Sequence, residues 1–333
     1  SVEARSNKLT GPTGRHQWLE IETNLGWLRT GRVNKSGIQY TIYEDPAQFP
    51  SDSHPQSTNK PLPSCILTKD RTLSAPGKPM KAYKNTQFLD SADARLLRIV
   101  SEFVEPQSRF AHHKIEDTIV FMGSARAPSP EDEHPTAGVV PASPELMVSA
   151  YAACRDLARR LTDWSKNLPE DHRRFVVCSG GGPGIMEAAN RGASDAGGIN
   201  VGLGISLPHE QANNHYITRE LSLEFHYFFM RKFWFAYMAK AVVFFPGGFG
   251  TLDELFEILT LLQTGKIRKH LPIVLYDESF WREAINFETL IKHGTISEDD
   301  LDLFLLTDSV DEAYEYLTAQ LSEYGVAEHG ATL

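Results

Sequence analysis

Short runs of apolar residues alternate with helical patterns along most of the chain after residue 80. These runs cover residues 118–122, 175–178, 199–205, 241–245, 272–276 and 303–306, and turn residues follow them. Continuous apolar runs are typical of strands that are buried on both faces, because helices cover both sides of a parallel sheet. The pattern therefore predicts an α/β fold, with a parallel sheet flanked by helices on each side.

Three segments have the period of an amphipathic helix, which places apolar side chains on one face. The apolar positions that share a face are Leu96, Leu97, Val100, Phe103 and Val104 in the first; Leu146, Met147, Ala150, Tyr151, Cys154, Leu157, Ala158 and Leu161 in the second; and Leu252, Leu255, Phe256, Leu259 and Leu262 in the third. The first helix is predicted over residues 91–104.

The first 80 residues follow a different pattern. Residues 37–43 alternate as a strand does, an apolar piece at 27–33 precedes them, and residues 46–79 form a polar, proline-rich run without periodicity. We predict an N-terminal extension over residues 1–80, with short β elements and a proline-rich strap, and one domain over residues 81–333. The extension is assigned no chemistry. The proline-rich residues 128–144 are predicted to form a loop, with a lid as the alternative.

Composition limits the class of protein. Hydrophobic residues make up 41% of the 333 residues, which is enough for a sizeable core and excludes wholesale disorder. The formal net charge of −10 argues against a broad surface for a nucleic-acid polymer. The three cysteines fit neither a disulfide framework nor a zinc site, so we expect them to be reduced and mostly packed.

The location of the protein is predicted from two segments. Residues 1–10 lack the apolar core of a signal peptide. The aromatic stretch 225–245 contains Arg231, Lys232 and Lys240, which makes it a poor membrane span. We therefore expect a soluble, cytoplasmic protein that does not bind membranes.

The loop at residues 179–190 leads from a predicted strand into a helix through four glycines. In a parallel sheet, ligands bind beyond the carboxyl ends of the strands, where the strand order reverses. Glycines let the backbone approach a ligand closely, and a helix N-terminus offers free N–H groups to an anion. Three consecutive glycines exceed what a turn needs, so we expect Gly181, Gly182 and Glu187 to bind substrate.

The loop at residues 246–254 makes a second strand-to-helix connection of this kind. Its glycines are Gly247, Gly248 and Gly250, and together with the Thr251 hydroxyl and the helix dipole they are typical of a phosphate cradle. The spacing of Thr251 and Glu254 is also that of a capping box, so a structural role for Glu254 is the alternative. Both roles are compatible, with Thr251 facing phosphate and Glu254 facing a sugar.

Two further pairs of residues are candidates. Arg231 and Lys232 lie among apolar and aromatic residues, where cations are costly to bury without an anionic partner, so we expect them to face a ligand or a carboxylate. The aromatic residues around them are mainly assigned to the core. Ser124 and Arg126 follow the first strand of the sheet, where they either contact phosphate or sugar or form a plain turn.

Motifs that the chain lacks narrow the ligand. Neither glycine loop contains the Gly-Lys-Ser/Thr of a P-loop, and no Gly-x-Gly-x-x-Gly occurs, so triphosphate hydrolysis and dinucleotide oxidoreduction are disfavoured. A mononucleotide fits better. The histidines of residues 208–215 suggest no third ligand, so no metal site is predicted, and no Ser-His-Asp arrangement or reactive cysteine is evident.

Residues 179–189, the Arg231–Lys232 pair and residues 246–254 together resemble the Lonely Guy (LOG) family. This family comprises cytokinin riboside 5′-monophosphate phosphoribohydrolases and their bacterial nucleotide-hydrolase relatives. The resemblance extends over about residues 81–325. It is greatest to the longer bacterial form, which has counterparts of residues 207–211 and 225–229. The short plant-type pattern reads Met-His-x-Arg-Lys, of which residues 228–232 keep only the cations.

The resemblance implies a Rossmann-like, doubly wound sheet, a homodimer or higher homo-oligomer with active sites near the subunit interface, and no cofactor. It implies cleavage of the N-glycosidic bond of a nucleoside 5′-monophosphate, AMP or a related purine or cytokinin nucleotide. Carried over by position, Arg231 and Glu254 are the catalytic pair, and Gly247, Gly248, Gly250 and Thr251 hold the phosphate.

Three other functions compete with this one. An interaction protein, in which the aromatic helix mediates assembly, would leave the glycine loops unexplained. A lysine decarboxylase, the label that such chains often carry, finds no support, because no lysine has the surroundings of a pyridoxal-phosphate site. A protein that binds or senses a nucleotide or a phosphorylated cofactor without turnover remains the alternative. A carboxylate beside the sugar favours the enzyme.

Overall fold

The computed structural model describes residues 19–23, 26–30, 40–43, 79–129, 144–169, 171–207 and 213–331. The chain divides into two compact units, Ser1–Lys78 and Pro79–Leu333, and each is described by itself.

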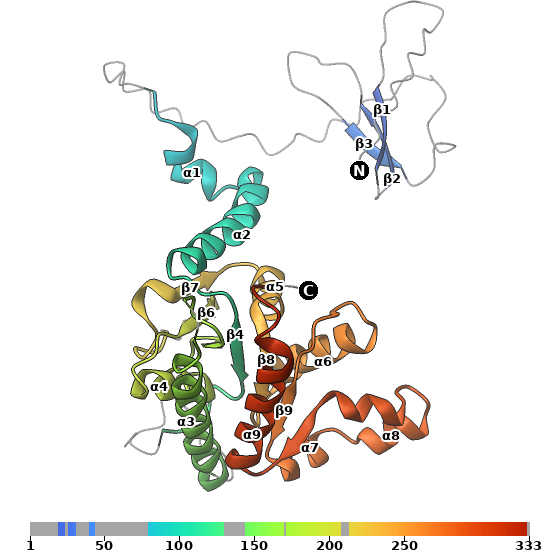
Figure 1. Cartoon of the computed structure of the whole chain (residues 1–333). Helices are drawn as coiled ribbons and strands as arrows, with labels where there is room; N and C mark the ends of the chain where they lie inside the picture. The colour runs from blue at the N-terminus through green and yellow to red at the C-terminus, as the bar shows by residue number, and fades with distance from the viewer. Residues whose placement is uncertain are drawn as a thin grey trace, which may run out of the picture. The chain divides into compact units, whose positions relative to one another are not determined.

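The first unit contains a three-stranded antiparallel sheet of β1 (Leu19–Thr23), β2 (Gly26–Thr30) and β3 (Tyr40–Tyr43) (Figure 1). Strands β2 and β3 overlap the two apolar pieces of the sequence, whereas β1 was not predicted. Most of the proline-rich run at 46–79 and of the predicted loop at 128–144 lies outside the described residues.

The second unit contains a seven-stranded sheet in which all neighbouring strands are parallel. In chain order its strands are β4 (Thr118–Met122), β5 (Val176–Ser179), β6 (Val201–Ile205), β7 (Ser222–Phe225), β8 (Ala239–Phe244), β9 (Ile273–Tyr276) and β10 (Leu305–Thr307). Their spatial order is β10-β9-β8-β4-β5-β6-β7, so the order reverses at β4. The predicted α/β fold with a Rossmann-like, doubly wound parallel sheet is confirmed.

Strand β7 was not predicted, and its position explains why. It lies at the edge of the sheet, where its Ser222 and Glu224 are less buried than Leu223 and Phe225. An edge strand that is covered on one face alternates apolar and polar residues instead of forming a continuous apolar run. Four residues are too few for that alternation to stand out in the sequence.

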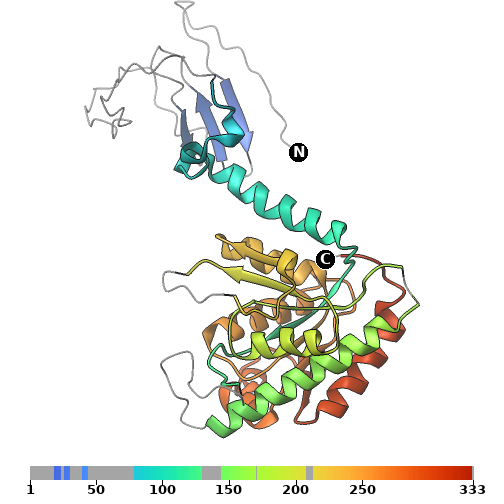
Figure 2. The ribbon, with the colours of Figure 1, turned by 90° about the vertical axis from the view of Figure 1, so that its left-hand side faces the viewer.

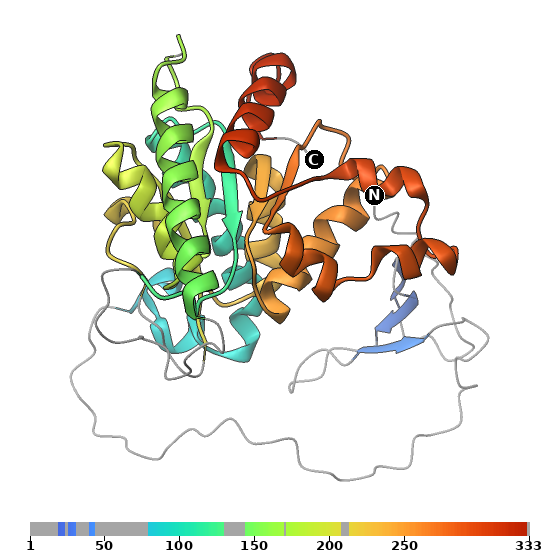
Figure 3. The same ribbon diagram turned by 90° about the horizontal axis from the view of Figure 1, so that it is seen from below.

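Helices cover both faces of the sheet. One face packs against α3 (Pro144–Lys166), α4 (Ile185–Asp195) and α9 (Val310–Gln320), and α9 runs beside α3 (Figure 2). The other face packs against α5 (Phe228–Met238), α6 (Phe249–Gln263) and α7 (Glu278–Ala284). Helices α7 and α8 (Phe287–Lys292) lie at the opposite end of the sheet from α4 (Figure 3). A short helix, α1 (Thr86–Leu89), precedes the strands of this sheet in sequence.

Helix α2 (Arg95–His112) confirms the predicted helix but not a buried apolar face. Leu96, Leu97, Val100 and Val104 are between 51% and 74% exposed, whereas Phe110, near the end of the helix, is buried. The second half of α2 packs on the domain through Phe110 and Trp234. Among the described residues, no helix is long and apolar enough to cross a membrane.

The cysteines agree in part with the expectation. Cys154 and Cys178 are buried and unpaired in the core, and Cys65 lies outside the described residues. Burial raises the pKa of both thiols above the ordinary value, which keeps them protonated and unreactive.

The loops at the carboxyl edge of the sheet are joined to one another by their backbones. Ser124, after β4, donates its N–H to the Pro246 carbonyl at 3.0 Å and accepts from the Ile185 N–H at 3.0 Å. Gly184 makes this contact possible, because it has a φ of +71° and a Cβ there would lie 2.3 Å from the Ser124 carbonyl oxygen. The turn at Ser124 therefore holds the two glycine loops in place, because it hydrogen-bonds to both of them.

Replacing Gly184 with alanine is expected to lower the free energy of unfolding by more than ~1 kcal/mol, because the strain of the positive φ and the clash with the Ser124 backbone act together. Gly197→Ala is the matched control: its φ is +64°, but the nearest atom to a Cβ there is 3.7 Å away. Urea unfolding of both variants measures the two effects. Equal losses in the two variants would show that the contact with Ser124 is unimportant.

Candidate active site

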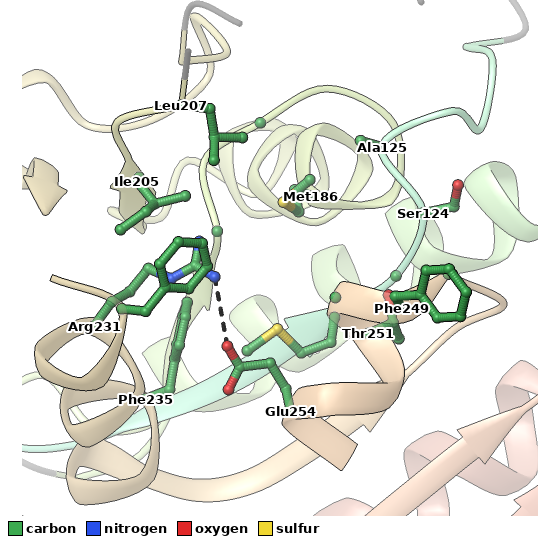
Figure 4. Close-up of a pocket in the computed structure, with 18 of the residues that line it drawn as sticks. Ser124, Ala125, Met186, Ile205, Leu207, Arg231, Phe235, Phe249, Thr251 and Glu254 are labelled. Atoms are coloured by element: carbon green, nitrogen blue, oxygen red, sulfur yellow. Dashed lines mark hydrogen bonds and ion pairs between the residues drawn. The ribbon is translucent and has the colours of Figure 1, made fainter. Parts of the chain in front are cut away.

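A cavity of about 910 Å³ opens at the carboxyl edge of the sheet. It is lined by the residues that follow β4, β5, β6 and β8, by Glu224 of β7, and by side chains of α5 and α6 (Figure 4). The strand order reverses at β4, so the cavity lies at the switch point where ligands bind in such sheets.

Most of the residues predicted for the site line this cavity, and some do not. The predicted residues that line it are Ser124, Arg126, Gly182, Arg231, Gly248, Gly250, Thr251 and Glu254. The predicted residues that are not part of its lining are Gly181, Glu187, Lys232 and Gly247. Roles in substrate binding or catalysis stay predictions for all twelve.

Internal contacts account for the position of Gly181 and Glu187. The Gly181 N–H donates to the Ser179 hydroxyl at 3.0 Å, and the Gly181 carbonyl accepts from the amide of Asn214. Glu187 accepts a hydrogen bond from the Tyr151 hydroxyl at 2.9 Å. These polar groups are therefore engaged in hydrogen bonds within the protein.

Lys232 has anionic partners, as its apolar surroundings predict, and these partners are carboxylates of the protein itself. Its Nζ lies 2.7 Å from a carboxylate oxygen of Asp253 and 2.6 Å from one of Glu257. Gly247 has a steric role, since a Cβ there would lie 2.1 Å from the Thr251 hydroxyl oxygen. The missing side chain of Gly247 lets Thr251 fold back over the loop.

Arg231 and Glu254 face each other across the floor of the cavity. Nη2 of Arg231, on α5, lies 3.5 Å from Oε1 of Glu254, on α6 (Figure 4), and the two side chains are 14% and 7% exposed. The guanidinium also lies over the rings of Phe228 and Phe235, at 5.3 and 5.6 Å. Its buried Nε has no hydrogen-bond partner among the described residues. An unpaired buried donor beside a cavity points to a ligand that pairs with it.

Burial sets the protonation of this pair. It raises the pKa of Glu254 from 4.5 to about 7, against the attraction of Arg231 and Lys232, which lowers it. Burial also lowers the pKa of Arg231, although arginine side chains stay charged in proteins. Glu254 therefore changes between carboxylic acid and carboxylate near neutral pH, next to a permanent cation.

The N-terminus of α6 points at the cavity. The helix begins at Phe249 with Gly248 as its N-cap, and no side chain caps it. The predicted capping box is absent, because Thr251 is the third residue of the helix and not its N-cap. The first N–H groups of a helix have no acceptor inside it, and the helix dipole adds a partial positive charge. Open backbone at Gly248 and Gly250, where a Cβ would meet nothing within 4 Å, completes a site for an anion.

Apolar side chains form walls that the sequence did not assign to a site. These are Met122, Met186, Ile205, Leu207, Phe228 and Phe235. The aromatic stretch before β8 was predicted to belong mainly to the core, and Trp234 and Phe235 are indeed buried. Phe228, at the start of α5, is half exposed into the cavity. The sequence signal that could have identified Phe228 as a site residue is its position three residues before Arg231.

Neither a metal nor pyridoxal phosphate fits the described residues. No group of three potential metal ligands occurs among them. Pyridoxal-phosphate enzymes hold the cofactor through a lysine, and no lysine belongs to the described lining of the cavity. Lys232, which is next to Arg231 in sequence, forms ion pairs with Asp253 and Glu257.

Three comparisons place the chain among known proteins. The family model described as possible lysine decarboxylase matches residues 186–317. A protein of Oryza sativa subsp. japonica, named as a probable cytokinin riboside 5′-monophosphate phosphoribohydrolase, is 26% identical over 217 residues, which are 65% of this chain and 82% of that protein. A cytokinin riboside 5′-monophosphate phosphoribohydrolase of Rhodococcoides fascians is 30% identical over 126 residues, which are 36% of this chain and 59% of that protein.

The chain is similar in sequence to proteins of the Lonely Guy family. The segment that the family model matches contains both α5 and α6, and with them Arg231 and Glu254. A solved structure of the molybdenum cofactor carrier protein from Chlamydomonas reinhardtii is 18% identical, with a TM-score of 0.39, over 62% of this chain and 99% of that chain.

The raised pKa of Glu254 predicts how stability depends on pH. Between pH 4.5 and about 7 the folded protein binds more protons than the unfolded chain, so the contribution of this group falls as pH rises through that window. Glu254→Gln removes the dependence. We expect the variant to gain stability relative to the wild type over this range, by on the order of 3 kcal/mol.

Urea unfolding at both ends of the window measures this difference. Glu283→Gln, at an exposed carboxylate of α7, is the matched control and should show no such gain. A difference between Glu254→Gln and wild type that stays constant with pH would contradict the raised pKa.

Proposed function

We propose that the chain hydrolyses the N-glycosidic bond of a nucleoside 5′-monophosphate and releases the free base and ribose 5-phosphate. The observation that carries this proposal is the buried Arg231–Glu254 pair, which lies beside the open N-terminus of α6 in one cavity. The relatives named as phosphoribohydrolases support the same reaction class.

The proposed reaction uses the pair at the sugar. The bond from C1′ to the base nitrogen breaks, its electron pair leaves with the base, and the oxygen of a water molecule bonds to C1′. One proton of that water ends on the base, so atoms and charge balance. Positive charge develops on the ribose as the bond breaks, and the carboxylate of Glu254 stabilises it and positions the water, as carboxylates do in glycoside hydrolysis.

Arg231 stabilises the departing base, the other product of the bond cleavage. The departing base carries negative charge, which a permanent guanidinium offsets. Arg231 already contacts Glu254 with Nη2, and its buried Nε remains to pair with the base or the sugar phosphate. The 3.5 Å separation within the pair is long for a hydrogen bond, so a ligand can enter without breaking a tight ion pair.

In this proposal the phosphate binds at the N-terminus of α6, next to the turn that contains Ser124 and Arg126. Binding of this non-reacting group contributes to lowering the barrier at C1′ only if it holds the sugar in the reactive position. We propose AMP or a related purine nucleotide as the substrate, cytokinin nucleotides included, because the apolar walls and Phe228 suit a flat base.

Glu254→Gln is the test of this proposal. Because the amide cannot carry the charge that the ribose cation needs, turnover is expected to fall by about 10²–10⁴-fold while nucleotide binding survives. The measurement is chromatography of base and ribose 5-phosphate released from a panel of nucleoside monophosphates and the matching nucleosides. Titration calorimetry with AMP reports binding.

Glu257→Gln is the matched control, since Glu257 lies one turn further along α6 and is not part of the cavity lining. It should keep its turnover. Full turnover in Glu254→Gln would show that Glu254 is not the catalytic carboxylate. Nucleotide binding without release of any base by the wild type would instead support the alternative, a protein that binds a nucleotide or a phosphorylated cofactor.

We also propose that two copies of the chain associate through the exposed apolar face of α2. Leu96, Leu97, Val100 and Val104 recur on one side of that helix, and a soluble monomer rarely leaves such a stripe uncovered. Val100→Glu places a charge in its middle. The mass measured by light scattering is expected to halve, to that of a single 37.3 kDa chain.

Arg95→Glu, at an exposed position on the opposite side of the same helix, is the control and should leave the assembly intact. A wild-type protein that is monomeric at all concentrations would refute this association.

A further inference from the structure

Polar side chains line the end of the cavity that lies farthest from α6. Ser206 follows β6, Glu224 is the third residue of β7, and Asn213 lies between them in sequence. Four strand intervals separate β8 from β7, and at about 4.8 Å each they span about 19 Å. Ile205 and Leu207, the neighbours of Ser206, lie across the pocket from Thr251, with Arg231 and Glu254 below them (Figure 4).

Hydrogen bonds fix the polar groups at this end. The Ser206 hydroxyl donates to Oε1 of Glu224 at 2.7 Å, which orients the carboxylate and leaves Oε2 as an acceptor. The Asn213 amide donates from Nδ2 to the Ser222 hydroxyl at 3.0 Å. Its Oδ1 lies over Gly204, where a Cβ would approach it to 2.8 Å. Both remaining oxygens can accept a hydrogen bond.

The direction of a bound nucleotide follows from the proposed function, on which this inference rests. With the phosphate at the N-terminus of α6 and C1′ beside Glu254, the base extends toward β6 and β7. Its edge then meets Glu224 and Asn213, while its face lies near Phe228. An ionised carboxylate can only accept hydrogen bonds, so the matching group on the base must be a donor.

We infer that Glu224, helped by Asn213, binds an exocyclic amino group of the base, so the substrates are nucleotides of amino bases such as adenine. A base with a carbonyl oxygen at that position, such as hypoxanthine, would set an acceptor against the carboxylate. Both oxygens would then lose hydrogen bonds that water supplied before binding. Glu224 acts as a specificity residue and takes no part in breaking the bond.

The test compares AMP with IMP, which carry an amino group and a carbonyl oxygen, respectively, at this position; the neighbouring N1 carries a hydrogen only in IMP. The wild type is expected to favour AMP in kcat/KM by about tenfold or more, because a site built for a donor penalises the analogue that lacks it. Glu224→Gln presents an amide that can donate to the IMP carbonyl. The ratio of AMP to IMP should therefore fall toward one, chiefly through better use of IMP.

Glu220→Gln is the matched control, since Glu220 precedes β7 and is not part of the cavity lining. It should keep the wild-type ratio. An unchanged ratio in Glu224→Gln, or a wild type that favours IMP, would overturn the inference.

Calorimetry separates this inference from the proposed function. If the wild type binds AMP more tightly than IMP and Glu224→Gln removes the preference, the base subsite stands even where no base is released. Failure of both nucleotides to bind would overturn the subsite. Tight, selective binding without hydrolysis would overturn only the proposed reaction.

Discussion

The burial of Glu254 against Arg231 is the interaction on which the cavity depends. The two side chains come from different helices, and each helix is fixed by a different strand. Helix α5 follows the edge strand β7 and leads into β8, so the chain crosses β6, β5 and β4 between them. That crossing carries Arg231 beneath the cavity to α6. Without it, Glu254 would be a buried carboxylate with no cation, which is strongly destabilising.

The proposed substrate is a phosphate compound, although the chain has a net charge of −10. Long-range attraction is unfavourable, so the binding groups must be local. In the proposed function they are the N-terminus of α6 and the side chains of Arg231 and Arg126, all of which line the cavity. Burial strengthens the first two, because the protein interior screens charges less than water does.

Most of the fold could be predicted from the sequence, because continuous apolar runs indicate strands that are covered on both faces. Strand β7 could not be predicted in this way, because it lies at the edge of the sheet and only two of its four residues are apolar. The glycine loops were likewise recognisable, but the tasks of single glycines were not. Gly184 serves a backbone contact with Ser124, whereas Gly248 leaves open space in the cavity. Residue type is the same in both cases, and only the packed structure separates them.

The candidate site divides in the same way. Lys232 and Arg231 are neighbours with the same charge, yet one binds Asp253 and Glu257 on the surface of α6 and the other enters the cavity. Consecutive helical positions point about 100° apart, so adjacent cations cannot share a target. The carboxylates of α6 differ in burial: Arg231 contacts the buried Glu254, whereas Lys232 contacts the more exposed Asp253 and Glu257.

The placement of Thr251 and Glu254 on one helix has a consequence for the proposed chemistry. Residues three apart share a helix face, with Cβ atoms about 5–6 Å from each other, and both side chains here are buried. The phosphate anchor and the carboxylate at C1′ thus belong to one rigid element. A ligand held at the N-terminus of α6 presents its sugar to Glu254 at a fixed distance, without any closing motion. A nucleoside without the phosphate would bind the same apolar walls but lose that alignment. The energy of phosphate binding is therefore expressed at the bond that breaks, and affinity for the base alone contributes little to the rate.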